Sequence, residues 1–159
     1  MTYSTSVSLL IIFNGVGIPA RMLAGHVADR YFGVLNTFIP IVFVNAILAY
    51  CWLAVTTQAS LYAFVAIYGL FSAGFQSLMP TTVASLTPDI RKTGTRLGMV
   101  FSVISVASLT GPPIGGALLT TDGGKYTAPI IWAATSMLVG VCLIVGARAH
   151  RYGRSMVKC

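Results

Sequence analysis

Long stretches without a charged side chain are the feature that most restricts how this chain can fold. Asp, Glu, Lys and Arg are all missing from residues 1–20, 31–88, 97–121 and 126–147. A helix needs about 20 apolar residues to cross the hydrocarbon core of a bilayer. Three of these stretches fit one crossing each, and the 58 residues from 31 to 88 fit two, with a polar break at Val55–Ser60. The spacing of the charges therefore predicts five membrane-spanning helices.

The composition agrees with a chain that lies in lipid. Of the 159 residues, 56% are hydrophobic and 8% are charged, whereas about 25% of the residues in a soluble domain are charged. We expect an all-α membrane protein, with a membrane domain over residues 1–148 and a basic tail over 149–159. The expected spans cover residues 4–28, 35–56, 60–86, 96–120 and 127–148, to within a few residues.

The sequence also argues against several classes of function. It has three acidic residues and neither an HExxH nor a serine-elbow pattern, so we do not expect an enzyme. The three cysteines form no CxxC pair and the two histidines lie far apart, so we expect neither a metal site nor a cofactor. The net charge of +7 comes from basic residues between the spans, without interleaved aromatic residues, and so predicts no nucleic-acid partner.

The basic residues predict how the chain is oriented, because Lys and Arg concentrate in the cytoplasmic connections of membrane proteins. Lys125 stands alone on one side of the expected spans, whereas eight basic residues fall on the other side: Arg30, Arg91, Lys92, Arg96, Arg148, Arg151, Arg154 and Lys158. We therefore expect a multi-pass protein of the plasma membrane with its N-terminus outside and its C-terminus in the cytoplasm. An outside N-terminus without a signal peptide also leads us to expect a piece of a longer protein.

The first expected span carries a charge inside the membrane. Arg21 lies eight residues before Asp29, or about 12 Å from the end of the helix, on the same face as Asn14. A charge at this depth costs at least about 2.5 kcal/mol and usually faces a cavity or a partner. We expect Arg21 to line a solute or proton pathway; the alternative is that its side chain extends to the lipid head groups.

Other polar residues extend the expected pathway. Gln76, in the third span, is an amide that either links two helices or contacts a ligand. In the fourth span Ser102 and Ser105 form a polar seam with Gly98. A stretch further along this span is expected to bend against a neighbouring helix and act as a hinge, with a static kink as the alternative: Gly111, Pro112, Pro113, Gly115 and Gly116.

Small residues predict close contacts between helices. Gly69, Ala73 and Ser77 share a face of the third span, and small side chains let the backbones of membrane helices approach each other. Gly25, in the first span, is expected to admit a neighbouring helix in the same way. Gly33 is expected to permit the tight reversal that follows that span.

A short polar motif ends the first span. Gly25, Asp29, Arg30 and Gly33 have the spacing Gly-x-x-x-Asp-Arg-x-x-Gly, which resembles the cytoplasmic loop motif of the major facilitator superfamily. An aspartate at a helix C-terminus opposes the helix dipole, so Asp29 is expected to serve another helix end or a basic partner. In that family the motif follows the second helix and recurs in a weaker form after the eighth, and this copy fits the weaker form.

Four motifs in a fixed order carry this resemblance over nearly the whole chain: "NGVGIPARMLAGHVADRYFG", "GFQSLMP", "TPDIRKTGTRLGM" and "GPPIGGALL". The chain resembles the C-terminal half of a major facilitator transporter, helices eight to twelve, and in particular the monocarboxylate-porter-like branch in its fungal form. The resemblance implies that Arg21 takes part in carboxylate and proton handling. Animal members place an aspartate four residues earlier, where this chain has Gly17, and the nearest polar residue, Asn14, cannot titrate.

The resemblance implies alternating access, in which two six-helix halves rock about a solute near the membrane midplane. We expect a secondary active transporter, or a truncated half of one, that moves a small organic solute such as a carboxylate, with symport as the implied coupling. The expected partners are the lipid bilayer, the solute and the missing N-terminal half. Two alternatives stay open, namely an efflux transporter for a fungal secondary metabolite and a non-transporting truncated membrane partner.

Overall fold

The computed structural model describes residues 3–121 and 123–152, and five long helices make up most of this part of the chain. They are α1 (Tyr3–Val27), α2 (Val34–Cys51), α3 (Gln58–Ser85), α4 (Ile90–Thr121) and α5 (Thr127–Tyr152), with a π-helical turn η1 (Ala28–Phe32) after α1 and a 3₁₀ turn η2 (Trp52–Ala54) after α2. Each of the five candidate spans is long and apolar enough to cross a membrane. The expected all-α membrane fold is confirmed, and no strand occurs in the described ranges.

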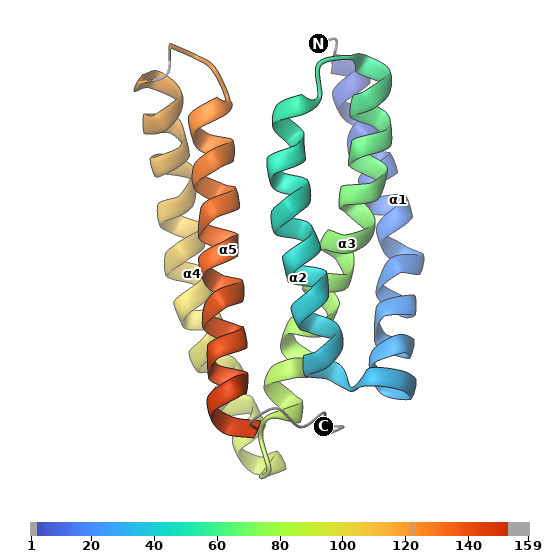
Figure 1. The fold of residues 1–159 in the computed structure, drawn as a ribbon, viewed down its shortest axis with the longest axis vertical. Helices are drawn as coiled ribbons and strands as arrows, with labels where there is room; N and C mark the ends of the chain where they lie inside the picture. The colour runs from blue at the N-terminus through green and yellow to red at the C-terminus, as the bar shows by residue number, and fades with distance from the viewer. Residues whose placement is uncertain (1–2, 122, 153–159) are drawn as a thin grey trace.

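The helices run up and down beside one another (Figure 1). α1 packs on α3, α2 packs on both α3 and α5, and α4 touches α3 and α5. The α1–α2 and α3–α4 connections lie at the lower end of the bundle in Figure 1, together with the last turns of α5. The basic connections therefore share one end of the bundle, as the charge count requires.

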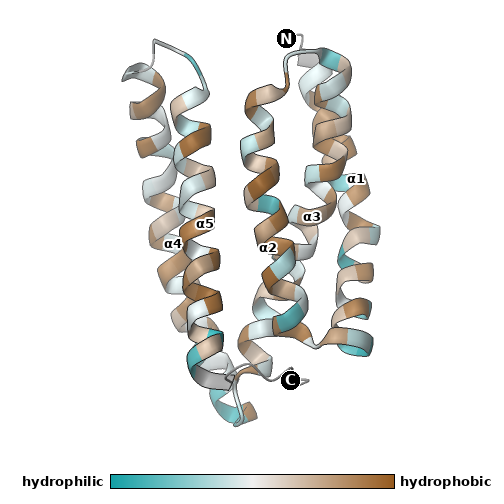
Figure 2. Cartoon of the chain, in the orientation of Figure 1, coloured by the Kyte–Doolittle hydropathy of each residue, from teal (hydrophilic) through white to brown (hydrophobic). Residues whose placement is uncertain are grey.

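The outer surface of the bundle is apolar, as a lipid environment demands. Figure 2 shows hydrophobic colours along every helix and hydrophilic colours mainly toward the lower end of the bundle, with some hydrophilic positions within α1 and α2. Leu109 is 77% exposed and Leu143 is 69% exposed, although both lie within candidate spans. Exposing large apolar side chains to water is unfavourable, whereas exposing them to the hydrocarbon of a bilayer is not. The fold is that of a multi-pass membrane protein.

The packed interior centres on α2. A cluster of buried side chains joins α2 to α3 and α5 through Phe38, Leu78 and Val141, and Phe38 stacks on Phe75 with ring centroids 5.6 Å apart. By contrast with α2, helix α4 has no buried residue in its candidate span. In these five helices α2 is thus the central element and α4 the least covered one.

Small residues hold α1 and α3 close together, as their spacing in α3 predicts. Ala73 is 3% exposed, and a Cβ added at Gly17 would lie 3.2 Å from the Cβ of Ala73. A Cβ added at Gly69 would lie 3.1 Å from the carbonyl oxygen of Phe13. We call this contact, made by Phe13, Gly17, Gly69 and Ala73, the α1–α3 seam.

The polar break in the long charge-free stretch falls where the sequence predicts it. Thr57 caps α3: its hydroxyl accepts a hydrogen bond from the backbone N–H of Ser60, and the Ser60 hydroxyl accepts one from the backbone N–H of Thr57. This reciprocal pair satisfies backbone donors that the first turn of a helix leaves without partners. Elsewhere the bounds shift, since α4 begins at Ile90 rather than near residue 96.

Two expectations about glycines find no close neighbour among the described residues and stay predictions. A Cβ added at Gly25 would meet nothing within 4 Å, and the same holds for the glycines of the expected hinge, Gly111, Gly115 and Gly116. α4 lies at the edge of the bundle, where it touches α3 and α5 but has no buried residue. The helix also runs on without interruption through Pro112 and Pro113.

The basic tail expected at 149–159 starts inside α5, and Arg154 and Lys158 lie outside the described residues.

We predict that Thr57→Ala lowers the stability of the chain by about 1 kcal/mol, because it removes the side-chain cap of α3. The midpoint of thermal unfolding of the purified chain in detergent measures this effect. Thr56→Ala is the matched control, since Thr56 makes no side-chain hydrogen bond in the described part of the chain. Equal midpoints for the two variants would show that the cap contributes nothing.

We also predict that Gly69→Val destabilises the bundle strongly, because the added side chain would collide with backbone atoms of α1. Gly98→Val is the control, because a Cβ at Gly98 meets nothing within 4 Å. The yield of monodisperse protein after detergent extraction should fall for Gly69→Val and stay near that of the unchanged chain for Gly98→Val. A similar yield for both variants would contradict the close approach of α1 and α3.

Candidate functional site

Two residues of the expected pathway meet at the side of the α1–α3 seam. Nη2 of Arg21, on α1, donates a hydrogen bond of 3.4 Å to Oε1 of Gln76, on α3. Arg21 lies one turn after Gly17, and Gln76 lies nearly one turn after Ala73, so the close backbone approach at the seam brings the two side chains within reach. Gln76 is thus an interhelical partner of Arg21.

The pair leaves most of the guanidinium free. A guanidinium has five N–H donors in a planar fork, and the hydrogen bond to Gln76 uses one of them. Both residues are exposed in this bundle. The remaining donors can bind the two oxygens of a carboxylate side by side, which is the geometry that favours arginine at anion sites.

No carboxylate of the spans neutralises Arg21. Of the three acidic residues in the sequence, Asp29 lies in η1 at the end of α1 and Asp89 directly precedes α4. Asp122 lies outside the described residues. The partner of Arg21 is therefore a neutral amide, and the positive charge of this site is not cancelled by any side chain that the structure describes.

The other residues of the expected pathway do not join this pair. Asn14 donates its side-chain N–H to the carbonyl of Leu10, within α1. Ser102 and Ser105 donate to carbonyls of their own helix, those of Gly98 and Ser102 respectively. Both serines are on α4, which packs on α3 and α5. The described structure thus brings together Arg21 and Gln76 and leaves the other three residues apart from them.

The loop motif forms a distinct local structure at the end of α1. η1 is a π-helical turn, closed by a hydrogen bond of 2.9 Å from the backbone N–H of Gly33 to the carbonyl of Ala28. Gly33 has φ of 82°, a left-handed conformation that side chains other than glycine disfavour. Asp29 and Arg30 are exposed, and neither forms an ion pair with another described residue. The tight reversal at Gly33 is confirmed.

Two polar contacts at the α3–α4 connection were missed from the sequence. Nη1 of Arg96 donates a hydrogen bond of 3.3 Å to the carbonyl of Leu86, the C-cap residue of α3. The carboxylate of Asp89 accepts a hydrogen bond of 3.1 Å from the backbone N–H of Arg91, at the start of α4. An aspartate just before a helix is an ordinary N-cap signal, so the second contact could have been predicted. The contact between Arg96 and Leu86 depends on the path that the chain takes between α3 and α4.

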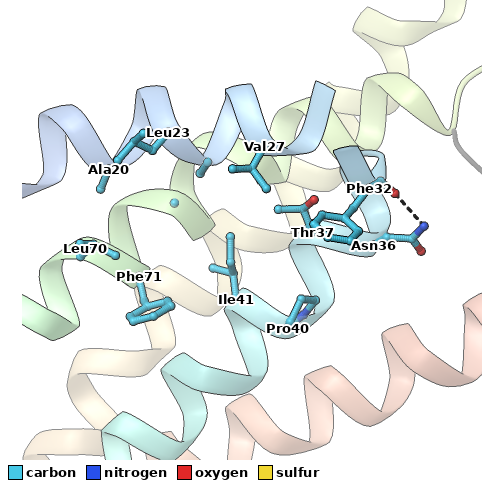
Figure 3. Close-up of a pocket in the computed structure, with 12 residues that line it drawn as sticks. Ala20, Leu23, Val27, Phe32, Asn36, Thr37, Pro40, Ile41, Leu70 and Phe71 are labelled. Atoms are coloured by element: carbon cyan, nitrogen blue, oxygen red, sulfur yellow. Dashed lines mark hydrogen bonds between the residues drawn. The ribbon is translucent and has the colours of Figure 1, made fainter. Parts of the chain in front are cut away.

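A large pocket lies on the opposite side of the seam from Arg21. Its volume is about 460 Å³, and it is lined by α1, α2 and α3 through residues such as Leu23, Ile41 and Phe71 (Figure 3). The polar side chain of Asn36 at one end donates a hydrogen bond to the carbonyl of Phe32. Arg21 and Gln76 do not line it. The pocket suits apolar groups such as lipid chains rather than a charged solute.

The fold and this site agree with the family that sequence comparison finds. A family model described as Major Facilitator Superfamily matches residues 2–155. The match covers nearly all of the sequence, and the chain therefore belongs to the major facilitator superfamily.

Fungal transporters of this family are similar to the chain. An MFS-type transporter of Gibberella zeae is 40% identical over 150 residues, which make up 94% of this chain and 34% of that protein. The Aspyridones efflux protein apdF of Emericella nidulans is 38% identical over 140 residues, or 88% of this chain and 28% of that protein. The MFS transporter asaE of Aspergillus flavus is 34% identical over 150 residues. The chain spans about a third of the length of these relatives. No solved structure matches it.

Proposed function

We propose that these five helices form one wall of the solute pathway of a secondary active transporter, and that Arg21 binds the solute. The observation that carries this proposal is the hydrogen bond between Arg21 and Gln76, on an exposed side of two apolar helices. A guanidinium cannot face hydrocarbon at that depth without a large cost. A water-filled cleft between two halves of a transporter removes this cost, because water and the solute then meet the charge.

The charge of the site supports a small organic anion, such as a carboxylate, as the solute. The guanidinium is tied to a neutral amide, so an incoming anion would not have to displace an acidic side chain. The same feature bears on coupling, since neither Gln76 nor Gly17 can carry a proton. A symported proton would then travel on the solute or on a part of the transporter outside these helices.

Export of a fungal secondary metabolite is the second candidate, and the similarity to the Aspyridones efflux protein favours it. Export would require the plasma membrane, with the basic end of the bundle in the cytoplasm.

We further propose that α4 is the moving wall of the pathway. It is the least covered helix, its polar seam at Ser102 and Ser105 would face the solute, and its glycine–proline stretch would act as the hinge.

The loop motif would act at the basic end of this pathway. Asp29 and Arg30 project from η1 without ion pairs in the described part of the chain, so both are free to contact the half of the transporter that this chain does not contain. Such contacts would fasten the two halves at that end in one state and release them in the other.

A chimera tests the proposal. The chain replaces the matching segment of the Emericella nidulans relative, and aspyridones in the medium are measured by mass spectrometry. We predict that the chimera exports aspyridones and that Arg21→Ala lowers export about tenfold or more, because a charge-assisted hydrogen bond is lost. Arg21→Lys should keep part of the activity, since it keeps the charge without the planar fork.

Arg91→Ala is the matched control, because it removes an exposed arginine at the end of the bundle rather than inside a span. Membrane levels of all variants are compared by immunoblot. Export by Arg21→Ala at the level of the unchanged chimera would contradict a solute-binding role for Arg21. A chimera that reaches the membrane but exports no aspyridones would instead favour the alternative of a membrane partner that does not transport.

A further inference from the structure

A second groove lies between α2, α3 and α5, near the basic end of the bundle. Its volume is about 220 Å³. Leu35 and Phe38 are buried residues of its lining, and Ile144 and Ala147 line it from α5. Thr82 also lines it, but the Thr82 hydroxyl donates to the carbonyl of Leu78 at 2.7 Å. The groove therefore offers an apolar wall, and its hydroxyl group is already engaged.

One charged side chain lines this apolar groove. Arg148 is half-buried on α5, and no carboxylate pairs with it among the described residues. Arg96 lines a neighbouring pocket of about 320 Å³. Leu86, at the end of α3, lines both pockets. Two arginines thus flank the same helix end.

The nearby acid does not pair with these arginines. Asp89 follows Leu86 by three residues, and its carboxylate accepts a hydrogen bond from the backbone N–H of Arg91. It forms no ion pair with Arg96 or Arg148 in the described part of the chain. Arg96 keeps donors beyond the one that it gives to Leu86. The end of α3 therefore presents two cations beside an apolar groove, at the end of the spans where lipid head groups lie.

We propose that this groove is a binding site for an anionic phospholipid. An acyl chain would lie along Phe38 and Ile144, and the phosphate would bind Arg148, with Arg96 within reach of the rest of the head group. Basic pockets between helices at the cytoplasmic surface are a general way of binding anionic lipids. The apolar lining excludes a free polar solute, and the unpaired charges favour a lipid with net negative charge.

This site is separate from the Arg21–Gln76 pair. The groove belongs to the contact of α2 with α3 and α5, whereas the pair belongs to the contact between α1 and α3. Failure of the transport proposal would leave the lipid site standing, and failure of the lipid site would leave the transport proposal standing.

The simpler explanation of Arg148 is that it only adds to the positive charge at one face of the membrane. A lipid site differs from this in two ways. It requires Arg148 in particular rather than any cation at that end, and it requires the apolar groove to be open.

Native mass spectrometry of the purified 159-residue chain tests the proposal, with phosphatidylserine and phosphatidylcholine titrated in detergent. We expect one phosphatidylserine per chain to bind more tightly than phosphatidylcholine. Arg148→Gln should weaken phosphatidylserine binding about tenfold, whereas Arg91→Gln, which removes the same charge outside the groove, should leave it nearly unchanged. Ala147→Trp should narrow the groove and weaken binding, whereas Ala149→Trp, at an exposed residue outside the groove lining, should not.

Equal losses for Arg148→Gln and Arg91→Gln would overturn the proposal in favour of diffuse charge. Unchanged binding by Ala147→Trp would show that no acyl chain enters the groove. Displacement of phosphatidylserine by millimolar inorganic phosphate would show a site for the free anion instead. Thermal unfolding midpoints of the four variants, measured without added lipid, separate these outcomes from misfolding.

Discussion

A positive charge among hydrocarbon chains is the constraint on which this structure depends. Arg21 lies inside a span, on an exposed side of α1, and its described side-chain partner is the neutral amide of Gln76. Because an amide cannot cancel the charge, something else must meet the guanidinium: water, an anion or another part of a larger protein. The side of the bundle that carries Arg21 therefore needs a polar partner. The other sides do not, because apolar helices can be exposed to lipid.

The packing of the helices separates the polar side of the bundle from its apolar sides. Small residues at the α1–α3 seam bring two backbones together, and this contact places Arg21 and Gln76 on one side and the large apolar pocket on the other. α2 fills the middle of the bundle against α3 and α5, and α4 remains at the edge. A helix with so few neighbours in this chain has the most freedom to move, which suits the role that we propose for α4 in alternating access.

Much of the fold could be predicted from the sequence because the bilayer sets the length of each span. The charge-free stretches located the five helices, and the break capped by Thr57 followed from its polar residues. The pairing of Arg21 with Gln76 could not be derived, since it depends on how α1 and α3 are rotated about their axes. Small residues permit a close approach but do not supply a neighbour, which is why the α1–α3 seam has one in the described part of the chain and Gly25 does not. Family resemblance added the motif order, and comparison with the family model then confirmed membership.

The water accessibility of position 21 tests the central claim most directly. In the chimera with the Emericella nidulans relative, stripped of all other cysteines, Arg21→Cys and Leu23→Cys are each treated with a membrane-impermeant sulfonate thiol reagent. The two positions lie at nearly the same depth, but Leu23 faces the apolar pocket (Figure 3). A water-filled cleft beside Arg21 predicts that the cysteine at 21 reacts and that the cysteine at 23 does not. Equal protection of both cysteines would contradict the account, because Arg21 would then have no aqueous pathway to line.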